Sequence, residues 1–526
     1  MSVDAWLDAA IGDATRRGLA SLTPLLEGLA AATRTLRDSD FAEQADGTHA
    51  ALPAGSPPGA HDRQDRDLVR ASTSRSPSSA PLLTIAEFGR RWRAGDITAV
   101  HATERCLESI GANAHLNAFI LTMAESALRE ATAADRERAA GLDRGPLHGV
   151  PVSIKDLFDV EGTPTTAASR VREAHRANAD AEAVAALRRA GAVIVGKTNL
   201  HEFAFGTTNE ESAFGSSKNP YDPSRSPGGS SGGSAVSVAA GMALASLGTD
   251  TGGSIRIPSA ACGLVGLKPG YGEVSLDGAV PLGYTLDHAG PLALTVSDAW
   301  TMYDVLRSRP AADRPDTPPP LSSCRLVVPY RYFCDLLDEG VRDRFDEALD
   351  RLSGVGVAIR EVVIPHAALV ATTYLHIVLA EAAAYHARTL ESCPEKYTEP
   401  VRMRLEMARY VQAEDYARAN LARRTLAWEV DGALGENDVL ALPTLPIPAP
   451  TLGAATVSVD GMQHPVRNLM LRLTQLFNLT GHPAISIPCG LTPSGLPVGL
   501  QLAGRRARTD ALLGVALAIE ERIARA

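Results

Sequence analysis

The middle of the chain alternates short apolar runs with longer amphipathic segments. Residues 182–191 place apolar side chains at helical spacing, and the apolar run 192–195 that follows them predicts a buried strand. A similar run, 149–154, ends at Lys155, so we expect a strand that carries the lysine amine at its end. This alternation, with frequent glycine and proline, predicts an α/β fold in which helices cover a central sheet.

Two glycine-rich turns interrupt this pattern. They read Gly-Gly-Ser at 228–230 and again at 252–254, and residues 234–247 between them are almost entirely small or apolar. Such a run predicts one buried helix with close neighbours and a turn at each of its ends.

Two later segments, 374–390 and 402–434, predict long amphipathic helices. We expect these helices to cover the acyl side of a substrate cleft. His376, Tyr385 and His386 are candidates for lining that cleft, although ordinary core or surface positions are the favoured alternative.

The first 83 residues differ from the rest. Residues 4–20 predict a helix, and a second helix is expected to start with Thr23 as its N-cap and Pro24 as its first residue. The apolar side of this second helix carries Leu25, Leu26, Leu29 and Leu36.

Beyond these helices the composition changes to Pro, Ser, Gly, Ala and mixed charge, which is typical of a flexible linker. We therefore divide the chain into a helical N-terminal extension (1–38), a flexible linker (39–83) and one large domain (84–526). Packing of the helical pair against the large domain is favoured over dimerisation or replacement of a small partner protein.

The second glycine turn has the backbone that acyl transfer needs. Residues 250–254 read Asp-Thr-Gly-Gly-Ser, and successive N–H groups in such a tight loop can hold a developing oxyanion. Ser254 is placed as a nucleophile, but a serine hydroxyl needs a base at neutral pH. No histidine lies between His201 and His288, so the usual base is missing from this stretch.

Lysine usage points to Lys155 as that base. Of 51 basic residues only five are lysines, and four of these lie between 155 and 268. An amine can lose its proton whereas a guanidinium cannot, and burial would lower the amine's pKa from about 10.4 to roughly 7–8. For Lys197, Lys218 and Lys268, a structural ion pair is an equally good interpretation.

Two shorter segments match a phosphate-loop pattern and a nucleophile-elbow pattern, but the residues around them do not fit either structure. Residues 191–198 fit the phosphate-loop pattern G-x-x-x-x-G-K-[ST], but a predicted helix precedes them and 192–195 are themselves the predicted strand. Residues 228–232 fit the nucleophile elbow G-x-S-x-G, yet a polar, proline-rich segment precedes them in place of an apolar strand. The histidines and cysteines form no ligand-spaced cluster, so we expect no metal and no cofactor.

Longer motifs in a fixed order resemble the amidase signature family. They are GVPVSIKD at 149–156, GKTNLHEFAFG at 196–206, NPYDPSRSPGG at 219–229, GGSSGGS at 228–234, GTDTGGSIRIPSAACGLVGLKP at 248–269, and NLTGHPAISIPCG followed by GLPVGLQLAG near the C-terminus. The resemblance spans roughly residues 84–526. It implies one large α/β domain with a mixed central sheet covered by helices, to which the helical N-terminal extension is added.

The resemblance also implies a Ser-Ser-Lys triad. Ser254 would be the nucleophile, Ser230 the bridging serine after a cis peptide, and Lys155 the base. The N–H groups of Ser254 and of the residues before it would form the oxyanion hole. Those residues are Thr251, Gly252 and Gly253.

Neighbouring residues are expected to support this triad. Ser231 and Thr249 are expected to donate or accept hydrogen bonds there, and Asp250 and Arg256 to form an ion pair that fixes the loop. In the family, the stretch that matches Ala204 and Phe205 approaches the substrate, although from the sequence alone ordinary core packing is an equally good interpretation.

Three functions from different classes follow. The favoured one is a hydrolase of small amides, extending to anilides, carbamates or ureas, that acts through a seryl acyl-enzyme. The alternative is the amidase subunit of a glutamine-dependent tRNA amidotransferase, acting in a complex, but such subunits usually carry glutamine where this chain has Ile257. A scaffold on an inactive amidase fold is the third, and the intact Lys155, Ser230 and Ser254 disfavour it.

The charge and composition of the chain indicate which kinds of partner and location to expect. The net charge is −10 with no basic block, so we expect no nucleic-acid partner. The first residues do not have the pattern of a signal peptide, and no apolar stretch of about 18 residues predicts a membrane span. The six cysteines are scattered along the chain, which fits the reduced thiols of a cytosolic protein. We therefore expect a cytoplasmic enzyme that takes a small-molecule amide, and a homodimer is compatible with the sequence; the sequon at Asn478 would carry no glycan there.

Overall fold

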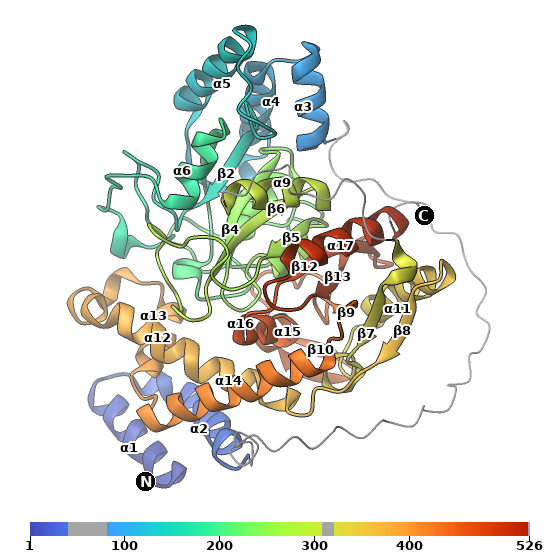
Figure 1. The fold of residues 1–526 in the computed structure, drawn as a ribbon. Helices are drawn as coiled ribbons and strands as arrows, with labels where there is room; N and C mark the ends of the chain where they lie inside the picture. Colours follow the sequence, from blue (N-terminus) through green and yellow to red (C-terminus); the bar gives the residue numbers. More distant parts are fainter. Residues whose placement is uncertain (40–81, 308–319, 524–526) are drawn as a thin grey trace.

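An eleven-stranded mixed sheet runs through the body of the protein (Figure 1). The computed structural model describes residues 1–39, 82–307 and 320–523. In spatial order the strands are β1 (Phe119–Thr122), β3 (Val193–Thr198), β2 (Pro151–Lys155), β4 (Ala245–Asp250), β6 (His288–Ala293), β5 (Val265–Lys268), β12 (Ala484–Leu491), β13 (Pro497–Ala503), β9 (Asp438–Pro443), β7 (Arg325–Val328) and β8 (Ala358–Glu361). A separate hairpin joins β10 (Thr456–Val459) to β11 (Met462–Pro465). The predicted α/β fold with a mixed sheet is confirmed.

Helices cover this sheet along its length. They are α3 (Ile85–Ala94), α4 (Ala99–Ala112), α5 (Ala124–Ala139), α6 (Glu182–Arg189), α7 (Gly232–Ala239), α8 (Arg256–Ala261), α9 (Val296–Leu306), α10 (Tyr330–Phe333), α11 (Glu339–Gly354), α15 (Val466–Arg472), α16 (Gln475–Thr480) and α17 (Thr509–Ile523). Helices α4, α5 and α7 pack against β2, β3 and β4, whereas α8, α11 and α17 pack against β12 and β13.

The strand pairing brings two chain segments to one edge of the sheet. Strands β2 and β4 are parallel neighbours, with Ile154 opposite Leu247. The carboxyl ends of parallel strands meet at the same edge, so Lys155 at the end of β2 lies near the end of β4. The strands predicted from 149–154 and 192–195 are confirmed as β2 and β3.

The single helix predicted for 234–247 is wrong. Helix α7 ends at Ala239, the chain turns at Gly241 with φ +67°, and β4 takes up 245–250. A run of small apolar residues suits a buried helix and a buried strand equally well, so its pattern could not separate the two. The second glycine turn therefore follows a strand and not a helix.

The predicted helix 402–434 is two helices. Helix α13 (Glu399–Ala408) and helix α14 (Ala413–Ala433) flank a break at 409–412, where Gln412 is extended. The break serves a tertiary contact, because the carbonyl of Tyr410 accepts a hydrogen bond from the Trp6 indole at 3.2 Å. The helix predicted for 374–390 is longer than expected and forms α12 (Val370–Ser392).

Residues Ala367–Ser392 form a helical stretch that is long and apolar enough, by length and composition alone, to cross a membrane. Within the fold, 67% of its most apolar window is buried. Helix α12 packs against α13, α14 and α16, so it is a core helix of the folded body, although no such stretch was expected from the sequence.

Two N-terminal helices, α1 (Val3–Arg16) and α2 (Thr23–Arg37), pack on α12, α13 and α14 at the bottom of Figure 1. Thr23 is the first helical residue and makes no capping hydrogen bond, so the predicted cap is wrong. The favoured packing against the large domain is observed, and buried polar contacts anchor it. The predicted linker lies outside the described residues from 40 to 81.

One of these contacts joins Arg37 of α2 to Asp415 of α14. Two guanidinium nitrogens donate to the two carboxylate oxygens at 2.7 and 2.8 Å, and the Asp415 side chain is 4% exposed. The Thr33 hydroxyl lies 3.0 Å from Nε2 of His376, which places His376 in the helix interface. Because buried charge pairs lose most when one partner is removed, Arg37 is the point at which to test this docking.

Replacing Arg37 with alanine is expected to loosen α1 and α2 from the body. Asp415 would keep a buried charge without its guanidinium partner, which costs on the order of 2–4 kcal/mol. Hydrogen exchange of residues 3–37, read by mass spectrometry, is expected to speed up by at least tenfold. Arg34→Ala is the control, because Arg34 pairs with the exposed Asp4 of the same helical pair and with no other acidic residue that the structure describes. Equal exchange in the two variants would contradict the anchoring role.

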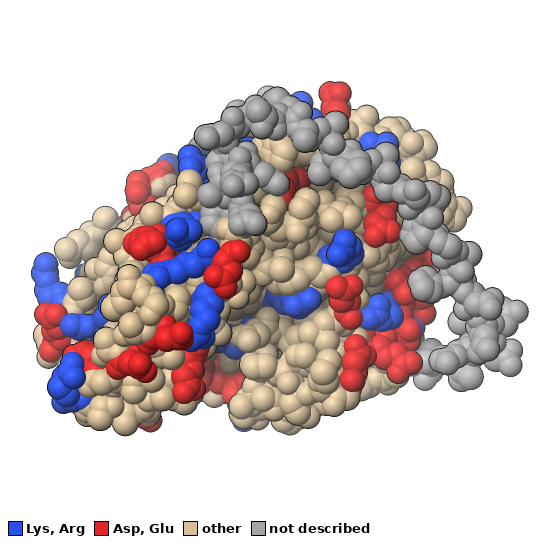
Figure 2. Space-filling model, turned by 90° about the horizontal axis from the view of Figure 1, so that it is seen from below, with Lys and Arg blue, Asp and Glu red and all other residues tan. Residues whose placement is uncertain are grey.

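The surface carries both signs of charge. Figure 2 shows acidic and basic side chains interspersed over the one face that it draws. All six cysteines are free.

Candidate active site

Lys155 lies between two hydroxyl groups at the edge where β2 and β4 end. Its Nζ is 2.8 Å from Oγ of Ser230 and 2.7 Å from Oγ1 of Thr249. Ser230 follows a cis peptide bond with Gly229, as the family resemblance implied. The lysine is completely buried, so these hydroxyls take the place of water around the amine.

Burial also changes the charge of this amine. Removal from water lowers the pKa of Lys155 to about 7, although the carboxylates of Asp250 and Asp287 oppose the shift. This agrees with the range expected from the sequence. At pH 8 most of the amine is neutral and can accept a proton.

The turn that holds Ser254 lies against the turn that holds Ser230. The Ser231 N–H donates to the Ser254 carbonyl at 3.2 Å, and the Ser231 hydroxyl donates to the Thr249 carbonyl at 3.1 Å. The supporting hydrogen bonds expected of Ser231 and Thr249 are therefore present. Ser254 is 6% exposed, whereas Ser230 is completely buried.

Four successive N–H groups in this turn are available to a ligand. Within the described ranges, the main-chain nitrogens of 251–254 donate no hydrogen bond, whereas those of Ile255 and Arg256 donate to Asp250. The two glycines allow a tight approach by neighbours. A Cβ on Gly252 would lie 2.5 Å from the Tyr374 hydroxyl, and one on Gly253 would lie 2.3 Å from Oγ1 of Thr474.

A fully buried ion pair fixes the base of the turn. Arg256 donates to Asp250 at 2.9 and 3.0 Å, which confirms the predicted pair. Although burial alone would raise it, the Arg256 guanidinium holds the pKa of Asp250 far below its usual value. The remaining guanidinium N–H groups donate to Asn478 and Gln501 at 2.7 Å each and to the Thr474 carbonyl at 2.9 Å.

Asp287 braces the other side of the turn. Its carboxylate accepts hydrogen bonds from the Thr251 hydroxyl at 2.5 Å and from the N–H groups of Leu282 at 2.9 Å and Gly283 at 3.2 Å. Burial raises its pKa to about 6. Asp287 thus links the expected oxyanion loop to the chain segment 281–287 that follows it in the fold.

A cavity of about 430 Å³ opens beside these groups. Its polar lining comes from Thr249, Thr251, Asp277 and Asp287, and most of the rest is apolar or aromatic. The apolar and aromatic lining residues are Leu157, Ala204, Leu276, Ala279, Val280, Pro281, Leu282, Tyr284 and Tyr385.

Of the residues expected to approach a substrate, Ala204 and Tyr385 line this cavity. Phe205 is buried instead, with the guanidinium groups of Arg404 and Arg467 each 5.6 Å from its ring centre. His386 lies in a separate cleft and stacks edge-on against Phe203.

Two other buried lysines, Lys197 and Lys268, make contacts that differ from those of Lys155. Lys197 on β3 forms a buried ion pair with Asp156 at 2.7 Å, which is the structural interpretation left open by the sequence. Lys268 is buried, and its amine donates to the Pro269 carbonyl at 3.0 Å. Across the described ranges, no group of three or more His, Cys, Asp or Glu side chains is arranged to hold a metal ion.

Asp287, Tyr374, Thr474 and Asn478 were not singled out as site residues from the sequence. In the sequence Asn478 stands out only as part of a glycosylation sequon. In the structure its side-chain amide donates to the carbonyl and to the carboxylate of Asp250, at 2.8 Å each. These residues lie up to about 230 positions from the turn they support, so local spacing gave no signal for them.

Replacing Asp287 with asparagine is expected to lower kcat at least tenfold, because the Thr251 brace weakens. It is also expected to move the acid midpoint of the pH–rate profile to lower pH, since the carboxylate that favours the charged form of Lys155 is gone. Asp277→Asn is the control, because Asp277 lies on the exposed rim of the same cavity. An unchanged midpoint in Asp287→Asn would contradict the electrostatic link.

Comparison with known proteins agrees with this geometry. The family model described as Amidase matches residues 101–513. Similar proteins include a glutamyl-tRNA(Gln) amidotransferase subunit of Chloroflexus aurantiacus, 38% identical over 80% of this chain and 93% of its own, and an amidase of Pseudomonas putida, 38% identical over 84% and 97%. A solved amidase structure superposes with a TM-score of 0.80 at 38% identity, covering 84% of this chain and all of the other.

Proposed function

Because the chain belongs to the amidase signature family and is an amidase-family hydrolase acting on C–N amide bonds, we propose that it works alone on small-molecule amides. The reaction passes through a seryl acyl-enzyme at Ser254, with Ser230 and Lys155 as the proton relay. The observation that carries this proposal is the buried amine of Lys155 within 2.8 Å of the Ser230 hydroxyl.

In the first half of the reaction, Ser254 Oγ attacks the carbonyl carbon of the amide. Its proton passes to Ser230, whose own proton passes to the neutral amine of Lys155. The carbonyl oxygen becomes an oxyanion, and the free N–H groups of 251–254 donate to it. The tetrahedral intermediate therefore forms without a charged group moving into the cleft from solvent.

In the second half, the C–N bond breaks and the leaving nitrogen takes a proton from Ser230. Lys155 then returns a proton to Ser230 and is neutral again. Water attacks the acyl-enzyme along the same relay, the ester bond to Ser254 breaks, and the serine regains its proton. The products are a carboxylic acid and an amine or ammonia.

Two features favour independent action over the role of an amidotransferase component. Ile257, where glutamine is usual in such subunits, is fully buried and packs in an apolar cluster with Leu445 and Met470. The helices α1 and α2 lie outside the family match and are fixed to α13 and α14 by this chain's own residues. The similarity to amidotransferase subunits keeps that role as the alternative.

The cavity favours small substrates with an apolar or aromatic part. Its volume of about 430 Å³ is near the lower end for small-molecule sites, and it holds no lysine or arginine among its lining residues. Anilides and aryl carbamates fit this lining as well as simple amides, since the same acyl transfer serves each carbonyl–nitrogen bond.

The test uses the purified chain without added partner proteins. Release of ammonia or arylamine is measured from glutamine, aliphatic amides, anilides and aryl carbamates, with hydroxylamine added to trap an acyl-enzyme as the hydroxamate. We expect turnover of one of the non-glutamine substrates and hydroxamate formation that Ser254→Ala abolishes. Activity limited to glutamine, appearing only with partner subunits, would establish the alternative.

A further inference from the structure

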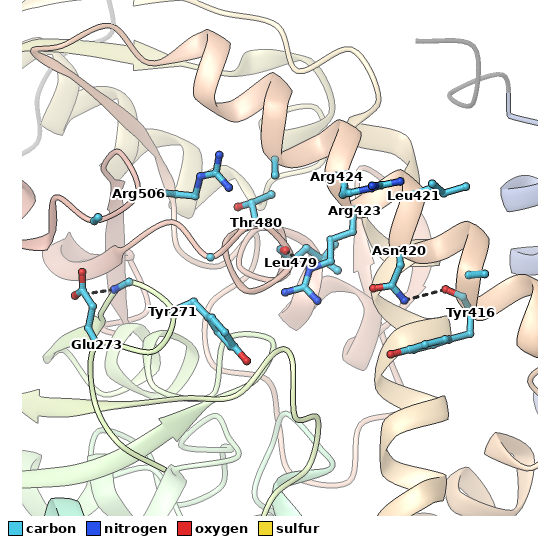
Figure 3. Close-up of a pocket in the computed structure, with 15 residues that line it drawn as sticks. Tyr271, Glu273, Tyr416, Asn420, Leu421, Arg423, Arg424, Leu479, Thr480 and Arg506 are labelled. Carbon is cyan, nitrogen blue, oxygen red and sulfur yellow. Dashed lines mark hydrogen bonds between the residues drawn. The ribbon is translucent and has the colours of Figure 1, made fainter. Parts of the chain in front are cut away.

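A second cavity, of about 950 Å³, lies outside the catalytic one (Figure 3). Helix α14 forms one wall through Tyr416, Asn420 and Arg423, and the loop after β5 forms another through Tyr271. Residues 479–481 at the end of α16 and the loop after β13 close it. It shares no lining residue with the catalytic cavity.

Three arginines line this cavity in a chain whose net charge is −10. Arg423 donates only to neutral oxygens, the Leu479 carbonyl at 2.5 Å and the hydroxyl and carbonyl of Thr285 at 2.7 and 2.6 Å. Arg424 is exposed and makes no hydrogen bond or ion pair within the part of the chain that is described. Arg506 pairs with Asp431 at the rim.

The lining has one acidic residue, Glu273. Its Oε2 accepts hydrogen bonds from Gly270 N–H at 3.1 Å, the Tyr303 hydroxyl at 2.5 Å and the Thr509 hydroxyl at 2.6 Å, and in Figure 3 the residue lies on the side of the cavity away from Arg424. Among the described residues the Arg424 guanidinium has no carboxylate partner, whereas the Arg423 guanidinium is linked to the Glu381 carboxylate through the Thr285 hydroxyl. Such a site favours an anion.

Aromatic rings flank the same space. In Figure 3 the Arg423 guanidinium lies between Tyr271 and Asn420, with the Tyr416 ring on the α14 side. Tyr271 is 49% exposed although its hydroxyl is fixed to the Tyr284 carbonyl at 2.9 Å. An exposed ring held in place offers a face to a planar or apolar group.

We propose that this cavity is a second ligand site, which binds an aromatic carboxylate with its charge toward Arg423 and Arg424 and its ring beside Tyr271. The segment 281–287 lies between the two cavities, since Thr285 accepts from Arg423 while Tyr284 and Asp287 line the catalytic cavity. A ligand here is in position to act on the catalytic loop. The inference does not depend on the proposed function, because it concerns binding alone.

The test measures binding of benzoate to full-length Ser254→Ala protein by isothermal titration calorimetry at low salt. We expect Arg424→Gln, alone and together with Arg423→Gln, to weaken benzoate binding by about tenfold or more, as loss of charge-assisted hydrogen bonds implies. Arg418→Gln, on α14 outside the cavity, is the matched control and is expected to bind like the parent protein. Benzyl alcohol, with the same ring and no charge, is expected to bind at least tenfold more weakly than benzoate.

Three results would overturn the proposal. The first is no benzoate binding up to tens of millimolar, and the second is equal binding by the cavity variants and Arg418→Gln. The third is binding that a Tyr385→Trp change in the catalytic cavity abolishes while the arginine changes leave it intact, which would place benzoate in the catalytic cavity. Thermal melting of each variant verifies that it is folded.

Discussion

Ser254→Ala is expected to lower kcat/KM for amide hydrolysis by on the order of 10³–10⁶-fold. Without the hydroxyl no acyl-enzyme can form, and what remains is the contribution of substrate binding and of the N–H groups at 251–254. Steady-state kinetics and a hydroxylamine trapping assay measure the two consequences separately. The fold is expected to be unaffected, since Ser254 Oγ makes no hydrogen bond within the described residues.

Ser259→Ala is the matched control for this change. Ser259 is a buried serine five positions along, and its hydroxyl also has no hydrogen-bond partner within the described chain. It is expected to keep kcat/KM within about twofold of wild type, as expected for a small change away from the reacting groups. A Ser254→Ala enzyme that keeps wild-type rates, or still forms hydroxamate, would contradict a nucleophilic role.

Lys155→Met is expected to lower kcat by on the order of 10³-fold or more, because Ser230 loses its only buried base. In the wild type, kcat/KM is expected to rise about tenfold per pH unit below pH 7 and to level off above it, since the neutral amine accumulates through a pKa of about 7. A flat profile between pH 5 and 8 would contradict Lys155 as the base.

The same substitution is expected to raise stability, most strongly at low pH. The pKa of Lys155 is about 7 in the folded chain and about 10.4 when unfolded, so the unfolded state binds more protons between these values. The cost of burying the amine is therefore full below pH 7, on the order of 4–5 kcal/mol, and shrinks as pH rises. The increase in melting temperature of Lys155→Met over wild type should be larger at pH 6 than at pH 9.

Local patterns predicted the parts of the fold that local rules decide. The apolar run before Lys155 and the helix–strand step at 182–195 depend on neighbouring residues, and both were found as expected. The single helix predicted for 234–247 was wrong because small apolar residues suit a buried helix and a buried strand equally well. The break at 409–412 was not predicted, because local periodicity does not show the contact that Tyr410 makes there with Trp6, about 400 positions away.

The residues of the candidate site also differ in whether the sequence alone could identify them. Lys155, Ser230 and Ser254 lie in glycine turns and at a strand end, which leave marks in the sequence, and the structure brings the segments that carry them together. Asp287 and Asn478 contribute single side chains from ordinary-looking segments, and only the folded topology shows what they touch. Motifs therefore pointed to the proposed reacting groups, whereas the residues that support them were visible only in the folded structure.

The anchoring of Arg256 has a consequence for how the enzyme is made. Its guanidinium donates to the Thr474 carbonyl, Asn478 and Gln501, which follow it by 218 to 245 positions. A ribosome has therefore synthesised nearly the whole chain before these acceptors exist, and contacts of such separation form late in folding. A chain shortened before Thr474 would contain Lys155, Ser230 and Ser254 but none of these three acceptors, so we expect its turn at 250–254 to be held less firmly.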